Sequence, residues 1–425
     1  MFNNIKCWIV PTNENQIRRN SAFWNMTSSL LNAVQTALLL LVITRVCGSV
    51  IGGIFSISAT IAYQANTIGN YSMRNFQATD VKEEYSFGIY VGSRFVTLIF
   101  MPVFLAVYIL LKGYAIEKTL IVLTFALFKS IDVIEDVIHG NFHQKGRLDF
   151  GGITETIRYF TSILLFIILI VVTKNLLVTN IIVTIASFTL FLILNIPLIK
   201  KFGGFQCEFN LKRIFCLLKV SFPLFICGFV YMYICNMPKY SIDSYMSEES
   251  QAVFGVIFMP VFVINLLSCF VYRPLLSYMA YDWKDGNFKS FFKVIKRQVL
   301  LILIITFAAM VAGYFLGAPI LGVVYGINLN GYESAIALLL LGGGISALIG
   351  FAASIVTIIR KQIVLYVGYF TSAIVGLTIS RPMVSNYGIY GAGILYDILM
   401  FVLLFALIIA ILIVVKLQKN KKIEE

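Results

Sequence analysis

One apolar stretch of the chain carries five ionisable residues at the spacing of a single helical face. The five are Lys129, Asp132, Asp136, His139 and His143, with Glu135 beside them. Steps of three, four, three and four place them on one side of a helix. In a membrane-spanning helix such charges cost about 2.5–3.5 kcal/mol each, so those that are retained usually face a cavity or a partner. Lys129 could contact a phosphate here, and Asp132, Glu135 and Asp136 could couple to a cation or proton.

The same stripe has two other interpretations. One is structural: Lys129 pairs with Asp132 or Asp136, and the helix ends in the cytoplasm near Asp136. The other is half of an acidic Mg²⁺-diphosphate site like that of membrane prenyltransferases. Such a site needs a second acidic cluster, and the remaining acids of the chain are scattered. We therefore expect no metal site and no cofactor.

Three arginines near the ends of apolar stretches are further candidates for binding an anion. Arg158 lies about a turn and a half into its stretch, and a guanidinium can grip a pyrophosphate with two hydrogen bonds. Arg45 and Arg273 lie closer to the ends, and Pro274 bends the chain directly after Arg273. Snorkelling of the side chain to the membrane surface is the alternative for each of them.

Amides and hydroxyls supply a second polar set. The first and second apolar stretches contribute Asn25, Asn32, Gln35 and Gln64, and later stretches contribute Asn236 and Asn265. These groups suit sugar hydroxyls, but hydrogen bonds between membrane helices explain them as well. Asp397 is the acid placed deep in the second half of the chain. It is a candidate for ion coupling, with an interhelical hydrogen bond as the alternative.

The elements that position these residues are about a dozen apolar stretches between Phe23 and Val415. Each is long enough, at about 20 residues, to cross a hydrocarbon core of about 30 Å as a helix. The chain is 59% hydrophobic and 12% charged, whereas a soluble chain carries about 25% charged residues. The sequence therefore predicts an all-α polytopic membrane protein.

The net charge of +13 is explained by location. Most of the lysines and arginines, Arg74 and Arg94 among them, fall on the inner side of the membrane when the N-terminus is placed inside. This asymmetry predicts that both termini are cytoplasmic, and it favours topology signals and anionic-lipid contacts over nucleic acid as a partner.

A basic, glycine-containing segment near the middle predicts two lobes of six helices. The expected organisation is an N-terminal cytoplasmic or interfacial segment, a first lobe, a cytoplasmic linker, a second lobe and a basic tail, at 1–22, 23–199, 200–213, 214–415 and 416–425. The outer loops are short, so they leave no room for an extracellular catalytic domain.

Several short strings across both halves resemble bacterial polysaccharide repeat-unit flippases of the multidrug/oligosaccharidyl-lipid/polysaccharide exporter superfamily. They are Arg74-x-Phe76-Gln77-x-Thr79-Asp80, the segment Asp136 to Asp149, Ser221-Phe222-Pro223-Leu224, Asn236-x-Pro238-Lys239-Tyr240, Gly255-x-x-x-Met259-Pro260 and Arg273-Pro274-Leu275. Their order and spacing carry the likeness, since no single string is diagnostic.

This resemblance implies a MATE-like (multidrug and toxic compound extrusion) protein that moves undecaprenyl-diphosphate-linked oligosaccharides across the bacterial cytoplasmic membrane by alternating access. It implies cavity cations for the diphosphate, and the matching candidates are Lys129, Arg158 and Arg273, with Arg45 and Lys239 toward the outer end. Other membrane proteins of polysaccharide assembly are candidate partners.

Two alternatives stay open at this point. One is a cation-coupled multidrug exporter of the same superfamily, although the first helix lacks the acidic residue that those exporters use. The other is a membrane polysaccharide polymerase or ligase, although the large outer loop expected of such an enzyme is missing. We therefore expect a transporter rather than an enzyme. The coupling ion, Na⁺ or H⁺, is not fixed by the sequence.

Overall fold

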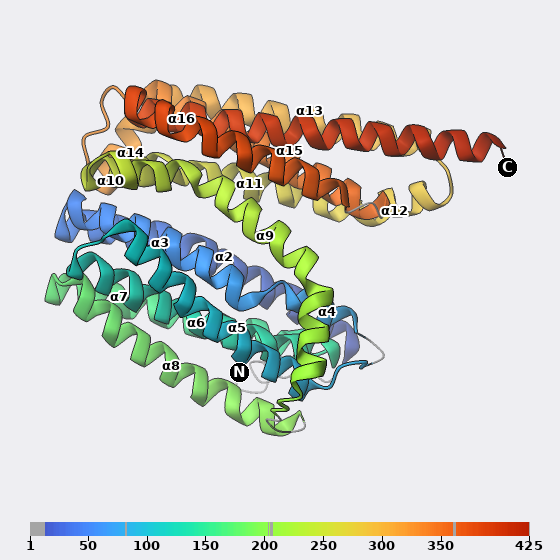
Figure 1. Cartoon of the computed structure of the whole chain (residues 1–425), viewed down its shortest axis with the longest axis horizontal. Coiled ribbons are helices and arrows are strands. Elements are labelled where there is room, and N and C mark those ends of the chain that lie inside the picture. Colours follow the sequence, from blue (N-terminus) through green and yellow to red (C-terminus); the bar gives the residue numbers. More distant parts are fainter. Residues whose placement is uncertain (1–12, 81–82, 203, 205–206, 360–362, 425) are drawn as a thin grey trace. The chain divides into compact units, whose positions relative to one another are not determined.

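The computed structural model describes residues 13–80, 83–202, 204, 207–359 and 363–424. Within these ranges the regular secondary structure is entirely helical (Figure 1). Helices satisfy every backbone hydrogen bond inside one segment, as a hydrocarbon environment requires, and this confirms the all-α class. Residues 1–12 of the predicted N-terminal segment, 203 and 205–206 of the predicted linker, and 425 of the tail lie outside the described residues.

The chain forms two compact units, Met1–Phe229 and Val230–Glu425. The division falls inside α9 (Leu211–Tyr245), not in the segment 200–213 where the sequence places the linker. Contacts of this region explain the difference. Glu208 N–H donates to the carbonyl of Gly88 at 3.0 Å, and the ring of Phe225 stacks on that of Tyr71 at 4.2 Å. The start of α9 and the residues before it therefore pack on the first unit.

The first unit is a helical bundle around two central helices, α3 (Ser49–Asn70) and α6 (Ile116–Gln144). The other helices are α2 (Glu14–Cys47), α4 (Met73–Thr79), α5 (Phe87–Lys112), α7 (Leu148–Thr173), α8 (Leu176–Lys201) and the start of α9. α2 begins nine residues before the predicted span because the side chain of Asn13 caps it, accepting from Asn15 N–H at 3.1 Å.

Small residues let α3 lie close to its neighbours. Its buried positions include Gly52, Ser56, Ala59 and Ala62, and a Cβ atom on Gly69 would lie 2.7 Å from Val133 of α6. Close backbone approach through small residues is the usual way in which membrane helices associate. α3 and α6 thus form the inner layer of the first unit.

The second unit is centred on α15 (Glu333–Ile359), most of which is buried. Its other helices are α10 (Glu248–Ile257), α11 (Met259–Tyr272), the 3₁₀ turn η1 (Arg273–Leu275), α12 (Leu276–Lys284), α13 (Phe288–Ala312), the π turn η2 (Gly313–Gly317), α14 (Ala318–Tyr325) and α16 (Ile363–Glu424). α16 contains a kink at Gly388, with φ 58° and ψ −137°, which joins two helical stretches.

Three consecutive glycines explain how α15 can occupy the centre. A Cβ atom on Gly342 would meet Tyr396 of α16, one on Gly343 would meet Val261 of α11, and one on Gly344 would meet Thr306 of α13. Successive residues of a helix point in directions about 100° apart, so the three glycines admit three different neighbours.

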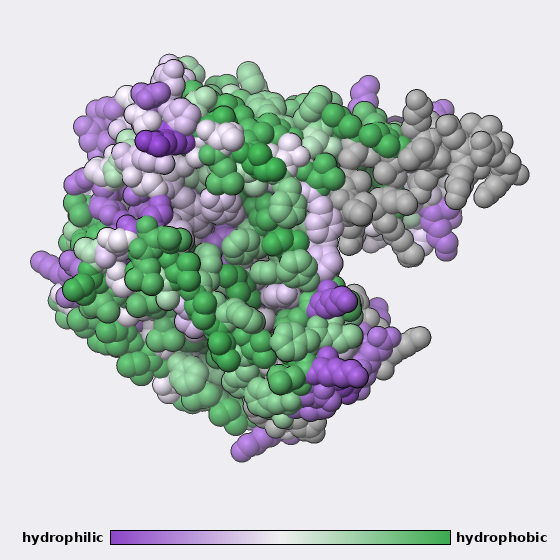
Figure 2. All heavy atoms as spheres, in the orientation of Figure 1, coloured by the Kyte–Doolittle hydropathy of each residue, from purple (hydrophilic) through white to green (hydrophobic). Residues whose placement is uncertain are grey.

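Nine helical segments of the described residues are long and apolar enough to cross a membrane. α3 and α6 are not among them, because α3 carries Gln64 and Asn66 and α6 carries its row of charges. Both lie largely buried inside the first unit, so other helices separate much of their polar surface from lipid. Figure 2 shows broad apolar surfaces along the helices and hydrophilic residues gathered toward their ends. The chain is a multi-pass membrane protein, and the count of twelve spans stays a prediction.

Candidate functional site

Lys129 of α6 lies fully buried in the first unit, with 0% of its side chain exposed. Its Nζ donates to Asp132 Oδ2 at 2.9 Å, to Gln35 Oε1 at 3.0 Å and to Asn32 Oδ1 at 3.3 Å. The ring of Tyr63 lies 4.9 Å from the ammonium. The structure therefore brings together four residues that the sequence assigned to separate roles, and it pairs Lys129 with Asp132 as the structural interpretation expected.

Arg158 of α7 is equally buried and joins the same cluster. Its Nη2 donates to Asp132 Oδ1 at 2.6 Å and its Nε to Glu135 Oε2 at 2.8 Å. Asn195 of α8 donates to the second oxygen of Glu135 at 3.2 Å. Asp132 and Glu135 therefore act as bridges that join α6 to α7 and α8, and snorkelling does not describe Arg158 in this structure.

Asp136 lies one turn after Asp132 on α6 and accepts hydrogen bonds from two more guanidinium groups. Arg94 of α5 donates to Asp136 Oδ2 at 2.7 Å and also to the carbonyl of Gly69 at 2.7 Å. Arg74 of α4 donates to Asp136 Oδ1 at 3.2 Å. Arg94 is 2% exposed. It lies seven residues into α5, and its guanidinium bonds to α3 and α6 inside the first unit.

His139 continues the stripe on α6 and contacts α7. Its Nδ1 lies 3.0 Å from Glu155 Oε1, and its Nε2 lies 3.0 Å from Thr154 Oγ1 and 3.7 Å from Glu135 Oε1. Ligand atoms of His139, Glu135 and Glu155 lie within 4.8 Å of one another, a spacing that could hold a metal ion. However, Glu135 already pairs with Arg158, and Arg74 lies 4.0 Å from Glu155, so both carboxylates face a cation.

The ion pairs of this network balance. Four cations, Lys129, Arg158, Arg94 and Arg74, face four carboxylates, Asp132, Glu135, Asp136 and Glu155. Four minus four leaves no net charge when His139 is neutral. An ion pair removed from water is stable only when its partners are well matched, and removal of one partner is costly. The arrangement is suited to holding α4, α5, α6, α7 and α8 in register.

The remaining predicted residues of the first unit lie apart from Lys129. Asn25 donates to the carbonyl of Leu148 at 3.1 Å, and Gln64 donates to that of Phe229 at 3.0 Å. Both amides therefore join elements far apart in the sequence, as the interhelical alternative expected. Arg45 is exposed in the last turn of α2, and His143 is exposed near the end of α6.

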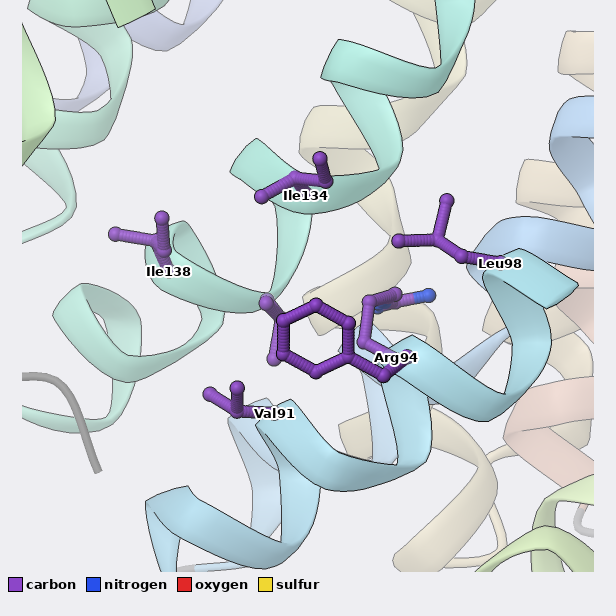
Figure 3. Close-up of a pocket in the computed structure, with 7 residues that line it drawn as sticks. Val91, Arg94, Leu98, Ile134 and Ile138 are labelled. Carbon is purple, nitrogen blue, oxygen red and sulfur yellow. The ribbon is translucent and has the colours of Figure 1, made fainter. Parts of the chain in front are cut away.

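A small apolar pocket adjoins Arg94 between α5 and α6 (Figure 3). It is lined by Val91, Arg94, Phe95, Leu98, Ile134, Val137 and Ile138. The guanidinium of Arg94 bonds to Asp136 and Gly69, so its hydrocarbon part is what remains to line the pocket. This pocket offers no acid or amide to a polar ligand.

Lys239 is a buried cation of the second unit. Its side chain, on α9, is 6% exposed, and its Nζ lies 5.0 Å from the centre of the Phe258 ring. None of the ion pairs found among the described residues of the chain involves Lys239, whereas Lys129 and Arg158 both contact carboxylates. A buried ammonium with an aromatic wall and no carboxylate partner is suited to receive an anion.

Asp397 of α16 is 6% exposed, and neither carboxylate oxygen has a hydrogen-bond partner among the described residues. It faces α15 at Gly342, where a Cβ atom would lie 2.3 Å from Oδ1. The other predicted residues of this unit are separate: Arg273 is exposed in η1, Asn236 bonds within α9, and Asn265 donates to Ser346 at 3.3 Å.

Comparison with known proteins gives the fold a name. No family model matches the chain. Lipid II flippase MurJ in an inward-closed conformation superposes with a TM-score of 0.70 at 14% identity, over 91% of this chain and 87% of MurJ. An inward-facing multidrug resistance MATE transporter of the MOP superfamily gives 0.67 at 13% identity, over 91% and 96% of the two chains. The chain therefore has a MATE-like fold.

A curated protein resembles this chain at the level of sequence. Capsular polysaccharide biosynthesis protein CapF of Staphylococcus aureus is 22% identical over 385 residues, which cover 88% of this chain and 94% of CapF. A MOP superfamily transporter from Pyrococcus furiosus superposes with a TM-score of 0.57 at 12% identity, over 96% of each chain. The predicted MATE-like class is confirmed, while the cytoplasmic position of both termini stays a prediction.

Sequence reasoning missed several residues that this fold places in the charge network. Arg94, Glu155 and Asn195 contact the predicted stripe from three different helices. Glu155 precedes Arg158 by three residues on α7, but its partners His139 and Arg74 lie on other helices. For Arg94 and Asn195 the contacts depend on how α5 and α8 pack, which no local spacing encodes.

Proposed function

We propose that the chain is a flippase that carries undecaprenyl-diphosphate-linked oligosaccharides across the bacterial cytoplasmic membrane during assembly of a surface polysaccharide. Capsule, O-antigen and exopolysaccharide are the candidate products. Two comparisons support this proposal: CapF is described as a capsular polysaccharide biosynthesis protein, and MurJ as a lipid II flippase. The MATE-like fold supports alternating access as the mode of transport.

The proposal rests on one observation: the ammonium of Lys239 is buried and forms no ion pair with a described carboxylate. A diphosphate cannot enter an apolar environment unless protein groups replace its water. Lys129 and Arg158 have their charges matched by Asp132 and Glu135, so an anion would have to break those pairs to use them. Lys239 needs no such rearrangement. We therefore place Lys239 first among the candidate diphosphate ligands. Arg273 and Arg45 are exposed candidates. Lys129 and Arg158 could bind the diphosphate only after their ion pairs break.

The remaining roles follow from the same proposal. Asp397 is the candidate for coupling to Na⁺ or H⁺, because its carboxylate is buried and has no partner among the described residues. A carboxylate in that position is costly when charged, and binding of a cation or proton relieves the cost. Asn236 and Asn265 are the candidate sugar contacts of the second unit, since their side chains bond only to Met232 and Ser346 among the described residues.

Multidrug export is the competing function, because one solved structure with this fold is described as a multidrug resistance transporter. The first helix weakens this alternative. The acid of α2 is Glu14, in its first turn, and no carboxylate follows within the apolar part of the helix. A drug exporter of this fold would need its coupling acid elsewhere.

The two functions separate in proteoliposomes. Purified protein is reconstituted with a fluorescent polyprenyl-diphosphate oligosaccharide, and the fraction of label protected from an external quencher is followed over time. We expect flipping of the diphosphate lipid well above protein-free liposomes, and no gradient-driven accumulation of cationic dyes. Dye accumulation without flipping of the lipid would favour the drug exporter and overturn the proposal.

A further inference from the structure

A row of cations lies on the first turns of α13, in the second unit. Lys289, Lys293, Lys296 and Arg297 are all exposed, and Lys284 is exposed at the end of α12. Steps of four, three and one place the four α13 residues on one side of the helix. The candidate membrane span Phe288–Tyr325 begins at the same point, so the row lies at the start of that span.

These cations are not compensated by acids of the described chain. The first turn of α13 contains no acidic residue, and no ion pair joins any cation of the row to a described carboxylate. Like charges three and four residues apart repel one another, so the row is unfavourable by itself. Cations at the starts of two other helices differ: Arg74 of α4 bonds to Asp136, and Arg147 before α7 bonds to Asp149 at 2.8 Å.

The corner before the row holds it in a fixed position and adds aromatic side chains. Gly286 adopts φ 75°, and the side chain of Asn287 caps α13 by accepting from Ser290 N–H at 3.3 Å. The ring of Trp283 packs 5.1 Å from that of buried Phe291. On α12, Tyr278 and Tyr281 are 69% and 67% exposed. Exposed tyrosines beside cations at the start of a span are typical of the lipid headgroup region.

We propose that the α12–α13 corner is a binding surface for anionic phospholipid headgroups of the leaflet that it faces. Phosphate groups of the lipid would accept from the four cations of α13, and Tyr278 and Tyr281 would lie among the headgroups. Charge complementarity selects this occupant, because each cation close to an anionic lipid surface adds to the attraction. The inference is independent of the transported substrate.

The test measures lipid binding to the whole purified protein by native mass spectrometry, with dioleoylphosphatidylglycerol and dioleoylphosphatidylcholine as probes. The variant K289Q/K293Q/K296Q removes three charges of the row. The control K200Q/K212Q/K219Q removes three exposed lysines that are scattered over α8 and α9. A third variant, K289R/K293R/K296R, keeps the charges. Thermal melting of each variant in detergent checks that it is folded.

We expect the parent protein to bind the anionic lipid at least tenfold more tightly than the zwitterionic one. The row variant should lose about tenfold in affinity for the anionic lipid, while the scattered control and the arginine variant stay within about twofold of the parent. An equal loss in the row variant and the scattered control would overturn the proposal, as would a parent without preference for the anionic lipid. Unchanged binding in the row variant would overturn it as well.

Discussion

Arg158 on α7 and Asp132 on α6 form a buried ion pair in which Nη2 donates to Oδ1 at 2.6 Å. Asp132 also accepts from Lys129 at 2.9 Å, and Arg158 also bonds to Glu135. Each member therefore has its charge matched on more than one side. We infer that these buried ion pairs hold the helices of the first unit together.

Loss of Arg158 should destabilise the protein strongly. The variant R158M leaves Asp132 and Glu135 buried without their guanidinium, and removal of one partner of a buried pair typically costs about 3–5 kcal/mol. We expect a marked fall in the melting temperature in detergent. The double variant R158M/E135M removes one stranded charge as well and should recover part of the loss. If R158M melts like the parent but no longer transports, Arg158 is a substrate contact and the structural role is wrong.

The packing of α2 on α7 should depend on Gly152. A Cβ atom there would lie 2.7 Å from the backbone of Trp24 and Asn25, and backbone cannot move aside as a flexible side chain can. We expect G152A to lower stability by about 1–3 kcal/mol, the usual cost of overpacking. G228A is the matched control, because Ser72 Oγ at 3.6 Å is its nearest contact. Equal melting temperatures for G152A and G228A would contradict this packing.

Asp397 should determine the ion dependence of transport. The variant D397N keeps the shape of the side chain but removes the ability to exchange a proton or bind a cation by charge. We expect flipping in proteoliposomes to lose its response to an imposed pH or Na⁺ gradient, while binding of the diphosphate lipid is retained. D243N is the control, because Asp243 lies in α9 with no place in this proposal. A full gradient response in D397N would remove Asp397 as the coupling group.

Local patterns predicted the helices and part of the site, while pairings between distant segments were out of reach. The spacing of the stripe predicted Asp132 and Asp136 as alternative partners of Lys129, and the structure pairs Lys129 with Asp132. The partner of Asp136 was not foreseeable, since Arg94 approaches from α5 across a contact that only the packed bundle creates. The boundary between the two units lies later in the chain than predicted for a similar reason, because Phe225 packs on Tyr71, which is distant in sequence. Composition could identify the basic loops, but not which of their cations find acids.

The central claim is that the ammonium of Lys239 binds the diphosphate of a lipid-linked oligosaccharide during transport. The flipping rates of variants that change this charge test the claim most directly. Rates are measured in proteoliposomes for the parent, K239R and K239Q, with a fluorescent polyprenyl-diphosphate oligosaccharide and with the same lipid bearing a single phosphate. K212Q, an exposed lysine of α9, is the control. We predict that K239Q loses at least tenfold in rate with the diphosphate lipid and less with the monophosphate lipid, and that K239R retains a substantial part. Parent rates in K239Q with both lipids would contradict the account.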